Sequence, residues 1–420
     1  MIDVTGISEH DGDATQGDQM STNHHEHSTD SGLLSGVAHA LASVHQEPPG
    51  SFVLHAPLEL MARAELLPQV SPLAREQARR RIVDIATAWS ATDTPTRSSQ
   101  GEVLDDPLDA LSAALAEGDI DAADHAYRAL CRQRSTAELI ADLAGSVLPH
   151  LGGAGHGSIF FELLPRFAPP GVNPALMART LVAELARHPD WRLTWIDHPR
   201  PRRHRTDSLT GRLLAPTSDE EPESTFIHPT MSLIDGSGLA AEVLGDVTLG
   251  LSVTQARGEL LRVAAQSMLQ DDPAHAPYGW THCLTLPHAA LAIAESSGDP
   301  QRAIDIAATY VLGFRATQSA GAIDPNWPPP PPTHLNADTA LEAGPDTAAA
   351  YAWHATSSER SCLAQAIVDY AATHQDAHLA KYTAAAFHAA RLDPAAAHLF
   401  GAASAYLAAW WHQHDNNNPT

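Results

Sequence analysis

The chain has 420 residues and a formal net charge of −25 with histidine counted as neutral, because 50 Asp and Glu residues face only 25 Lys and Arg. Such an acidic balance argues against a nucleic-acid partner and against binding to an anionic membrane surface. Hydrophobic residues make up 44% of the chain, which is enough to bury a large core and excludes wholly disordered and collagen-like classes.

The N-terminal sequence and the cysteine content indicate the cellular compartment of the protein. Residues 1–32 are polar and acidic, with neither the basic nor the apolar region of a signal peptide, so we expect a disordered tail. Its HHEH stretch at 24–27 is interpreted as solvated low-complexity sequence, with metal binding as the alternative. The three cysteines form no CxxC, and no apolar run approaches the roughly 18 residues of a membrane span. We therefore expect a cytoplasmic protein.

Helical periodicity dominates the rest of the chain. In LAREQARRRIVDIATAWSA, the residues Ala78, Ile82, Ile85 and Trp89 follow three- and four-residue steps, and PALMARTLVAELARH repeats this period. Further helical segments are expected at 107–117, 121–133, 136–149, 238–269, 287–297, 300–314, 347–371, 376–391 and 394–412. A strand signal occurs in the window 242–253, and one such window does not make a sheet.

These patterns predict a mainly α fold, with one large, bundle-like helical domain over 33–412 and a C-terminal tail at 413–420. Composition breaks and a proline run predict long loops at 199–225 and 323–346. A solenoid is the weaker alternative, because no motif recurs with a period of about 34 to 45 residues.

Lys381 is the only lysine in the chain. On a helix continuous through this region, His374, His378, Lys381 and His388 share one face. One interpretation is a solvated face in a protein that favours arginine. The other is a functional site, since a desolvated lysine amine can lose its proton and add carbon dioxide to form a carbamate, which a guanidinium cannot do.

Other histidines stand in apolar helical settings. His55 precedes Pro57 at a predicted helix start, and His156 lies between glycines ahead of an apolar helix. His282 and His288 lie before and inside another apolar helix. Each is compatible with a hydrogen-bonded core histidine as well as with a metal ligand.

Five short motifs together carry a resemblance to a known family. They are LHAPLELMARAELL, GHGSIFFELL, WTHCLTLPHAA, HLAKYTAAAFHAARLDP and GAASAYLAAWW. In this order and spacing, from about residue 50 to 412, the chain resembles the questin oxidase-like family. The resemblance implies a mainly helical fold and a mononuclear non-haem iron, Fe(II), held by four histidines and one carboxylated lysine.

Position by position, the resemblance implies one set of metal ligands, with His374 as the alternative to His378. The set is His55, His156, His282, His378 and Lys381. It further implies an oxidoreductase of secondary metabolism that uses dioxygen to ring-cleave, hydroxylate or insert oxygen, in the Baeyer–Villiger manner, into a small aromatic polyketide or quinone. A requirement for NADPH as external reductant is left open.

Further roles are assigned around this predicted centre. His288 and His354 are candidates for proton transfer. Aromatic residues near the motifs are candidates for an apolar substrate pocket, or else ordinary core: Phe160, Phe161, Trp280 and Tyr382. Two other functions stay open, a metal-dependent hydrolase with a carbamylated lysine and a non-enzymatic helical binding or scaffold protein.

Overall fold

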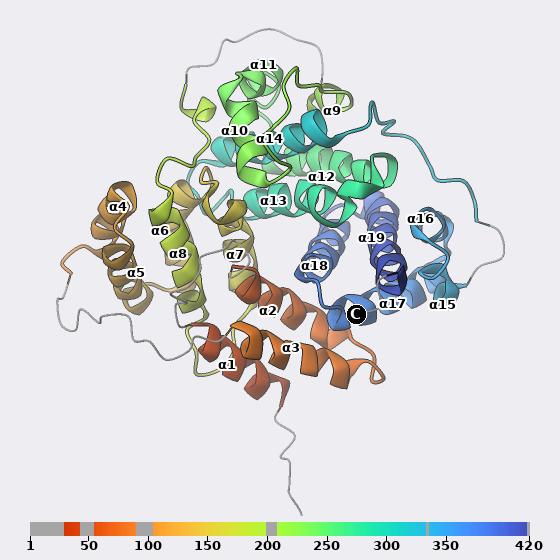
Figure 1. Cartoon of the computed structure of the whole chain (residues 1–420), viewed down its shortest axis with the longest axis horizontal. Helices are drawn as coiled ribbons and strands as arrows, with labels where there is room; N and C mark the ends of the chain where they lie inside the picture. Colours follow the sequence, from red (N-terminus) through yellow and green to blue (C-terminus); the bar gives the residue numbers. More distant parts are fainter. Residues whose placement is uncertain (1–28, 43–53, 90–103, 199–207, 333–335, 418–420) are drawn as a thin grey trace, which may run out of the picture.

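The structure is a computed structural model that describes residues 29–42, 54–89, 104–198, 208–332 and 336–417. These residues form helices and turns, and no β-strand occurs among them; the one extended pairing is an isolated antiparallel bridge between His150 and Arg192. The prediction of a mainly α fold is confirmed (Figure 1).

The helices of the first half of the chain are α1 (Asp30–Leu41), α2 (His55–Leu66), α3 (Arg75–Trp89), α4 (Pro107–Glu117), α5 (Ile120–Gln133), α6 (Thr136–Val147), α7 (Gly157–Leu163) and α8 (Arg179–Arg187). Those of the second half are α9 (Leu209–Leu213), α10 (Ile227–Gly236), α11 (Leu239–Leu244), α12 (Val253–Gln270), α13 (Thr281–Ala292), α14 (Pro300–Gln318), α15 (Ala337–Ala340), α16 (Pro345–His354), α17 (Ser357–Thr373), α18 (Ala377–Leu392) and α19 (Ala397–Asn417).

Helix α13 occupies the middle of the molecule. It packs against α7, α12, α14 and α18, and α18 in turn packs against α2 and α19 (Figure 1). One continuous apolar cluster runs through these contacts and is rich in alanine, which lets helices approach closely. Segments far apart in sequence, α2, α7, α13 and α18, are thereby brought around a common centre.

Capping explains where two expected helices divide. The segment 347–371 is split into α16 and α17, because Thr356 and Glu359 form a capping box that starts a new helix. The segment 238–269 is split in the same way, with Ser252 and Gln255 capping α12. The strand signal at 242–253 does not correspond to a strand, since these residues hold the end of α11 and the approach to α12.

The predicted ends and loops also need correction. Thr29 caps α1, so helix begins inside the expected N-terminal tail, and α19 continues to Asn417 in the expected C-terminal tail. The loop 199–225 contains α9, and the loop 323–346 contains α15. The HHEH stretch lies outside the described residues.

The predicted helix through His374 is interrupted. Helix α17 ends at Thr373 with His374 as its C-cap, and α18 begins at Ala377 after its N-cap, Asp376. Among the described helices, none has the combined length and apolar character that crossing a membrane requires.

Candidate metal centre

Four histidines and the single lysine meet between α2, α7, α13 and α18. The Nε2 atoms of His156 and His282 lie 3.3 Å apart, and Lys381 Nζ lies 3.3 Å from the same His156 atom. The ring of His55 is 4.6 Å from that of His378 and 4.8 Å from that of His156, centroid to centroid. The five residues predicted as metal ligands are therefore neighbours in space.

A strained loop delivers His156 to the cluster. Gly153, Ala154 and Gly155 take left-handed φ angles of 60°, 57° and 67°, which glycine adopts far more readily than other residues. A Cβ atom at Gly155 would lie 2.6 Å from the Tyr310 hydroxyl, so packing also demands glycine there. The GGAG sequence thus permits the turn that places His156 at the start of α7.

Helix α13 begins with an irregular turn that positions His282. Residues Ala276–Trp280 form a π-helical turn, a feature that recurs at functional sites. Pro287 lies inside α13, where it removes one backbone hydrogen-bond donor. His282 is the second residue of α13 after this turn, and its Nε2 faces that of His156.

Three of the imidazoles are oriented by a bond at Nδ1. His156 Nδ1 donates to the Gly153 carbonyl at 2.8 Å, and His282 Nδ1 donates to the Tyr278 carbonyl at 2.6 Å. His378 Nδ1 donates to the Asp376 carboxylate at 2.9 Å. This leaves an unprotonated Nε2 on each ring, the arrangement that commonly orients metal-binding histidines.

Burial favours the neutral form of each group in the cluster. It lowers the pKa of His156 and His282 well below the ordinary value, and lowers that of His378 to about 4. Burial also lowers the pKa of Lys381 to about 7, against the opposing effect of the carboxylates of Asp376 and Glu59.

The donor set fits a divalent metal ion. With Nδ1 protonated, His156 and His282 turn lone pairs toward each other at 3.3 Å, and a shared cation would relieve that repulsion. Metal bonds of about 2.0–2.2 Å put neighbouring ligand atoms about 3.0–3.6 Å apart, which matches this spacing. A nitrogen-rich set of this kind suits iron, and a carboxylated Lys381 would add one oxygen donor.

A cavity of about 260 Å³ opens on the histidines. Besides His55, His156, His282 and His378, its lining comprises Ala154, Thr225, Phe226, Ile227, Tyr278 and Phe314. These six contribute mainly apolar surface, and Phe226 and Tyr278 are its exposed aromatic members. The cavity offers an apolar chamber directly beside the candidate metal ligands.

The sequence did not single out these cavity aromatics. Tyr278 has a recoverable signal, because it stands four residues before His282 on one helical turn. Phe226 and Phe314 have none, since Phe226 stands at the N-cap of α10 and Phe314 lies in α14. The aromatic residues proposed from sequence are buried and do not line this cavity: Phe160, Phe161, Trp280 and Tyr382.

The remaining predicted residues lie elsewhere. His374 directs Nε2 to Asp415 at 3.0 Å, which leaves His378 as the histidine of this region that joins the cluster. His354 is exposed and its Nε2 lies 2.7 Å from the Pro329 carbonyl, so its position lends no support to a catalytic role. His288 belongs to a separate group with Glu162 and His388.

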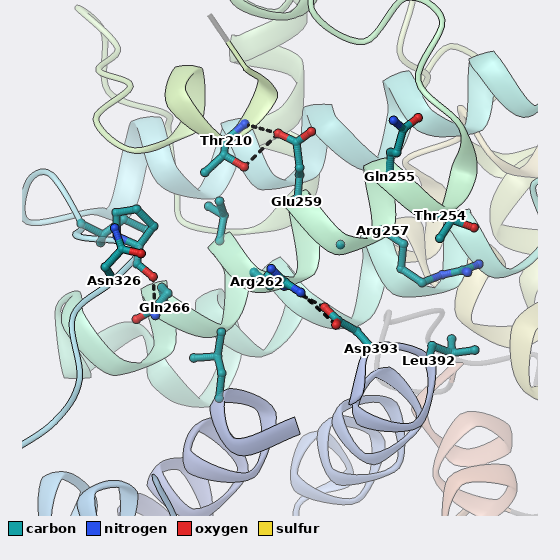
Figure 2. A pocket seen from close by; sticks show the side chains of 15 residues that line it. Thr210, Thr254, Gln255, Arg257, Glu259, Arg262, Gln266, Asn326, Leu392 and Asp393 are labelled. Carbon is teal, nitrogen blue, oxygen red and sulfur yellow. Dashed lines mark hydrogen bonds and ion pairs between the residues drawn. The ribbon is translucent and has the colours of Figure 1, made fainter. Parts of the chain in front are cut away.

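A larger groove of about 560 Å³ lies along α12 and the end of α18 (Figure 2). Three of its charged groups already have partners within the groove. Arg262 holds Asp393 through bonds of 2.7 and 2.9 Å, and Glu259 accepts bonds from the backbone and hydroxyl of Thr210.

Comparison of the chain with protein-family models, with curated proteins and with solved structures finds no match in any of the three.

Proposed function

We propose that this protein is a non-haem iron-dependent oxygenase of the questin oxidase-like type, which oxidises a small aromatic polyketide or quinone with dioxygen. The observation that carries the proposal is the convergence of His55, His156, His282, His378 and Lys381 beside an apolar cavity. The family resemblance of the sequence motifs supplies the reaction class.

Each ligand has a stated task in this proposal. His156, His282 and His378, oriented through Nδ1, would hold Fe(II) through Nε2, and His55 would add a fourth imidazole. The neutral amine of Lys381 forms a C–N bond to carbon dioxide and releases one proton, giving a carbamate that supplies an anionic oxygen. When bound, iron supplies the one-electron chemistry that reactions with dioxygen require.

The size and lining of the cavity support a small aromatic substrate. Its volume of about 260 Å³ lies near the lower end of the range for ligand pockets, so it suits a small, flat molecule. The rings of Phe226, Tyr278 and Phe314 offer stacking surfaces for an aromatic ring.

The fold bears on the hydrolase alternative. Hydrolases with a carbamylated lysine are typical of β/α barrels, whereas the described part of this chain contains no strand. The helical scaffold without metal chemistry is the alternative that the experiment below addresses.

The test is the iron content of anaerobically purified protein, wild type beside Lys381→Ala. We expect the variant to lose about one iron per chain, because a five-ligand site loses its only anionic donor. Arg80→Ala, which removes an exposed cation from a helix, is the matched control. Oxygen uptake with a hydroxylated anthraquinone, with and without NADPH, then tests turnover and the need for a reductant.

Full retention of iron in Lys381→Ala would show that Lys381 is not a metal ligand. Absence of bound metal from both proteins would favour the scaffold.

A further inference from the structure

A second group of metal-binding side chains lies outside the histidine cluster and its cavity. Its members are Glu162 at the end of α7, His288 on α13 and His388 on α18, whose ligand atoms all lie within 4.8 Å of one another. Glu162 Oε1 is 3.8 Å from His288 Nδ1 and 3.6 Å from His388 Nδ1.

The group sits on the same helices as the histidine cluster. It follows His156, His282 and Lys381 by just under two turns, or about 9 to 11 Å along each helix. The two groups are therefore separate sites that share their supporting elements.

Several polar atoms of this group have no hydrogen-bond partner. His288 is only 1% exposed, yet neither of its ring nitrogens has a partner among the described residues. His388 Nδ1 is also buried and has no hydrogen-bond partner among the described residues. The spacings to Glu162 are too long for hydrogen bonds, and leaving such atoms unpaired costs free energy. A ligand between the three residues would remove that cost.

The charged surroundings are compatible with a cation. Arg166 binds Glu162 Oε1 at 2.6 Å and Glu65 at 3.1 Å, so Glu65 offsets its charge. A carboxylate accepts about four contacts, and Arg166 uses one of them. The remaining lone pairs of the Glu162 carboxylate are available to a cation.

We propose that Glu162, His288 and His388 form a second divalent-metal site, for a zinc(II) or iron(II) type ion. Two imidazole nitrogens and one carboxylate oxygen are the protein ligands of both catalytic zinc and mononuclear iron centres. Ligand atoms around a tetrahedral ion with bonds of about 2.1 Å lie about 3.4 Å apart, close to the 3.6 and 3.8 Å that separate Glu162 Oε1 from the two histidine nitrogens. The side chain of His388 is 22% exposed, which gives the ion a way in.

This site does not depend on the proposed oxygenase function. An ion bound there joins α7, α13 and α18 beyond the histidine cluster, and so stabilises the frame on which that cluster is built.

The experiment titrates the full chain, stripped with a chelator, with cobalt(II) in bicarbonate buffer under nitrogen, with binding followed by calorimetry and visible absorption. The wild type is expected to bind two equivalents. Glu162→Gln and His288→Phe are each expected to lose one equivalent and keep the other. Glu76→Gln, a change of an exposed glutamate, is the matched control and keeps both.

The companion variant Lys381→Met separates this proposal from the previous one, because it is expected to lose the other equivalent. Cobalt stoichiometry unchanged by both Glu162→Gln and His288→Phe would overturn the second site and leave the histidine cluster untouched. Should either variant fail to fold by circular dichroism, His388→Asn, at the partly exposed member, decides the question by the same stoichiometry.

Discussion

At the residue scale, Asp376 joins local folding to the candidate site. Its carboxylate caps α18 by accepting a bond from the His378 backbone amide at 2.6 Å, and also receives His378 Nδ1 at 2.9 Å. Burial raises its pKa, but the bonds from His378 outweigh this and the pKa is lowered. One ionised side chain therefore starts the helix and orients a histidine of the cluster.

Asp376→Asn is expected to separate these two roles. Asparagine caps helices about as well as aspartate, so the thermal unfolding midpoint should change little. Loss of the anionic partner of His378 should weaken iron affinity about 10- to 100-fold. Affinity is measured by competition with a chelator, with Asp119→Asn, an exposed N-cap of α5, as control. Unchanged affinity would show that the carboxylate does not support a metal ligand.

At the scale of elements, a buried arginine fixes α2 against the junction between α17 and α18. Arg63, 1% exposed, donates to the carbonyls of Ala371, Ala372 and His374 at 2.5–2.9 Å and pairs with Glu59. These carbonyls end α17 and lack partners within their helix. Because α2 begins with His55 and α18 carries His378, this contact sets the spacing of two site histidines.

Arg63→Met is expected to reduce the free energy of unfolding by about 3–5 kcal/mol, since it leaves buried carbonyls uncapped and takes one partner from the buried Glu59. Urea unfolding followed by circular dichroism measures the loss. The control, Arg80→Met on the exposed side of α3, should stay within about 0.5 kcal/mol of wild type. A loss below about 1 kcal/mol in Arg63→Met would mean that Arg81, which also binds Glu59, is sufficient.

At the scale of the whole molecule, the candidate ligands come from α2, α7, α13 and α18, spread over most of the chain. Without a cation, the centre holds a buried amine and several buried imidazoles facing one another. A metal that binds only the folded chain should therefore contribute to its global stability.

Removal of metal with a chelator is expected to lower the thermal unfolding midpoint, by an amount equivalent to about 4 kcal/mol if free metal had been 1,000 times its dissociation constant. Iron(II) under nitrogen should restore the midpoint, while magnesium should not, because it prefers oxygen ligands. Differential scanning calorimetry measures both steps. In the double variant Lys381→Met, Glu162→Gln, the chelator should have no effect; an equal drop there would place the stabilising ion elsewhere.

The local pattern was sufficient for much of the fold. Periodicity predicted the helices, because a helix that buries one face must repeat its apolar residues every three or four positions. The divisions within 238–269 and 347–371 were missed, although the capping boxes at Ser252 and Thr356 are legible in the sequence. The prediction that one helix runs through His374 was wrong for the same reason: it overlooked a cap, here Asp376, which starts α18.

Helical periodicity and composition were enough to predict the helical class and to single out Lys381 and the histidines in apolar surroundings; their roles as metal ligands stay a prediction. The three-dimensional arrangement was needed to see that these residues meet, which cavity they face, and that Glu162, His288 and His388 form a separate group. The reason is physical. Periodicity records which face of one helix is buried, whereas a site depends on how faces of several helices are aligned along and around one another, which packing across the whole core decides.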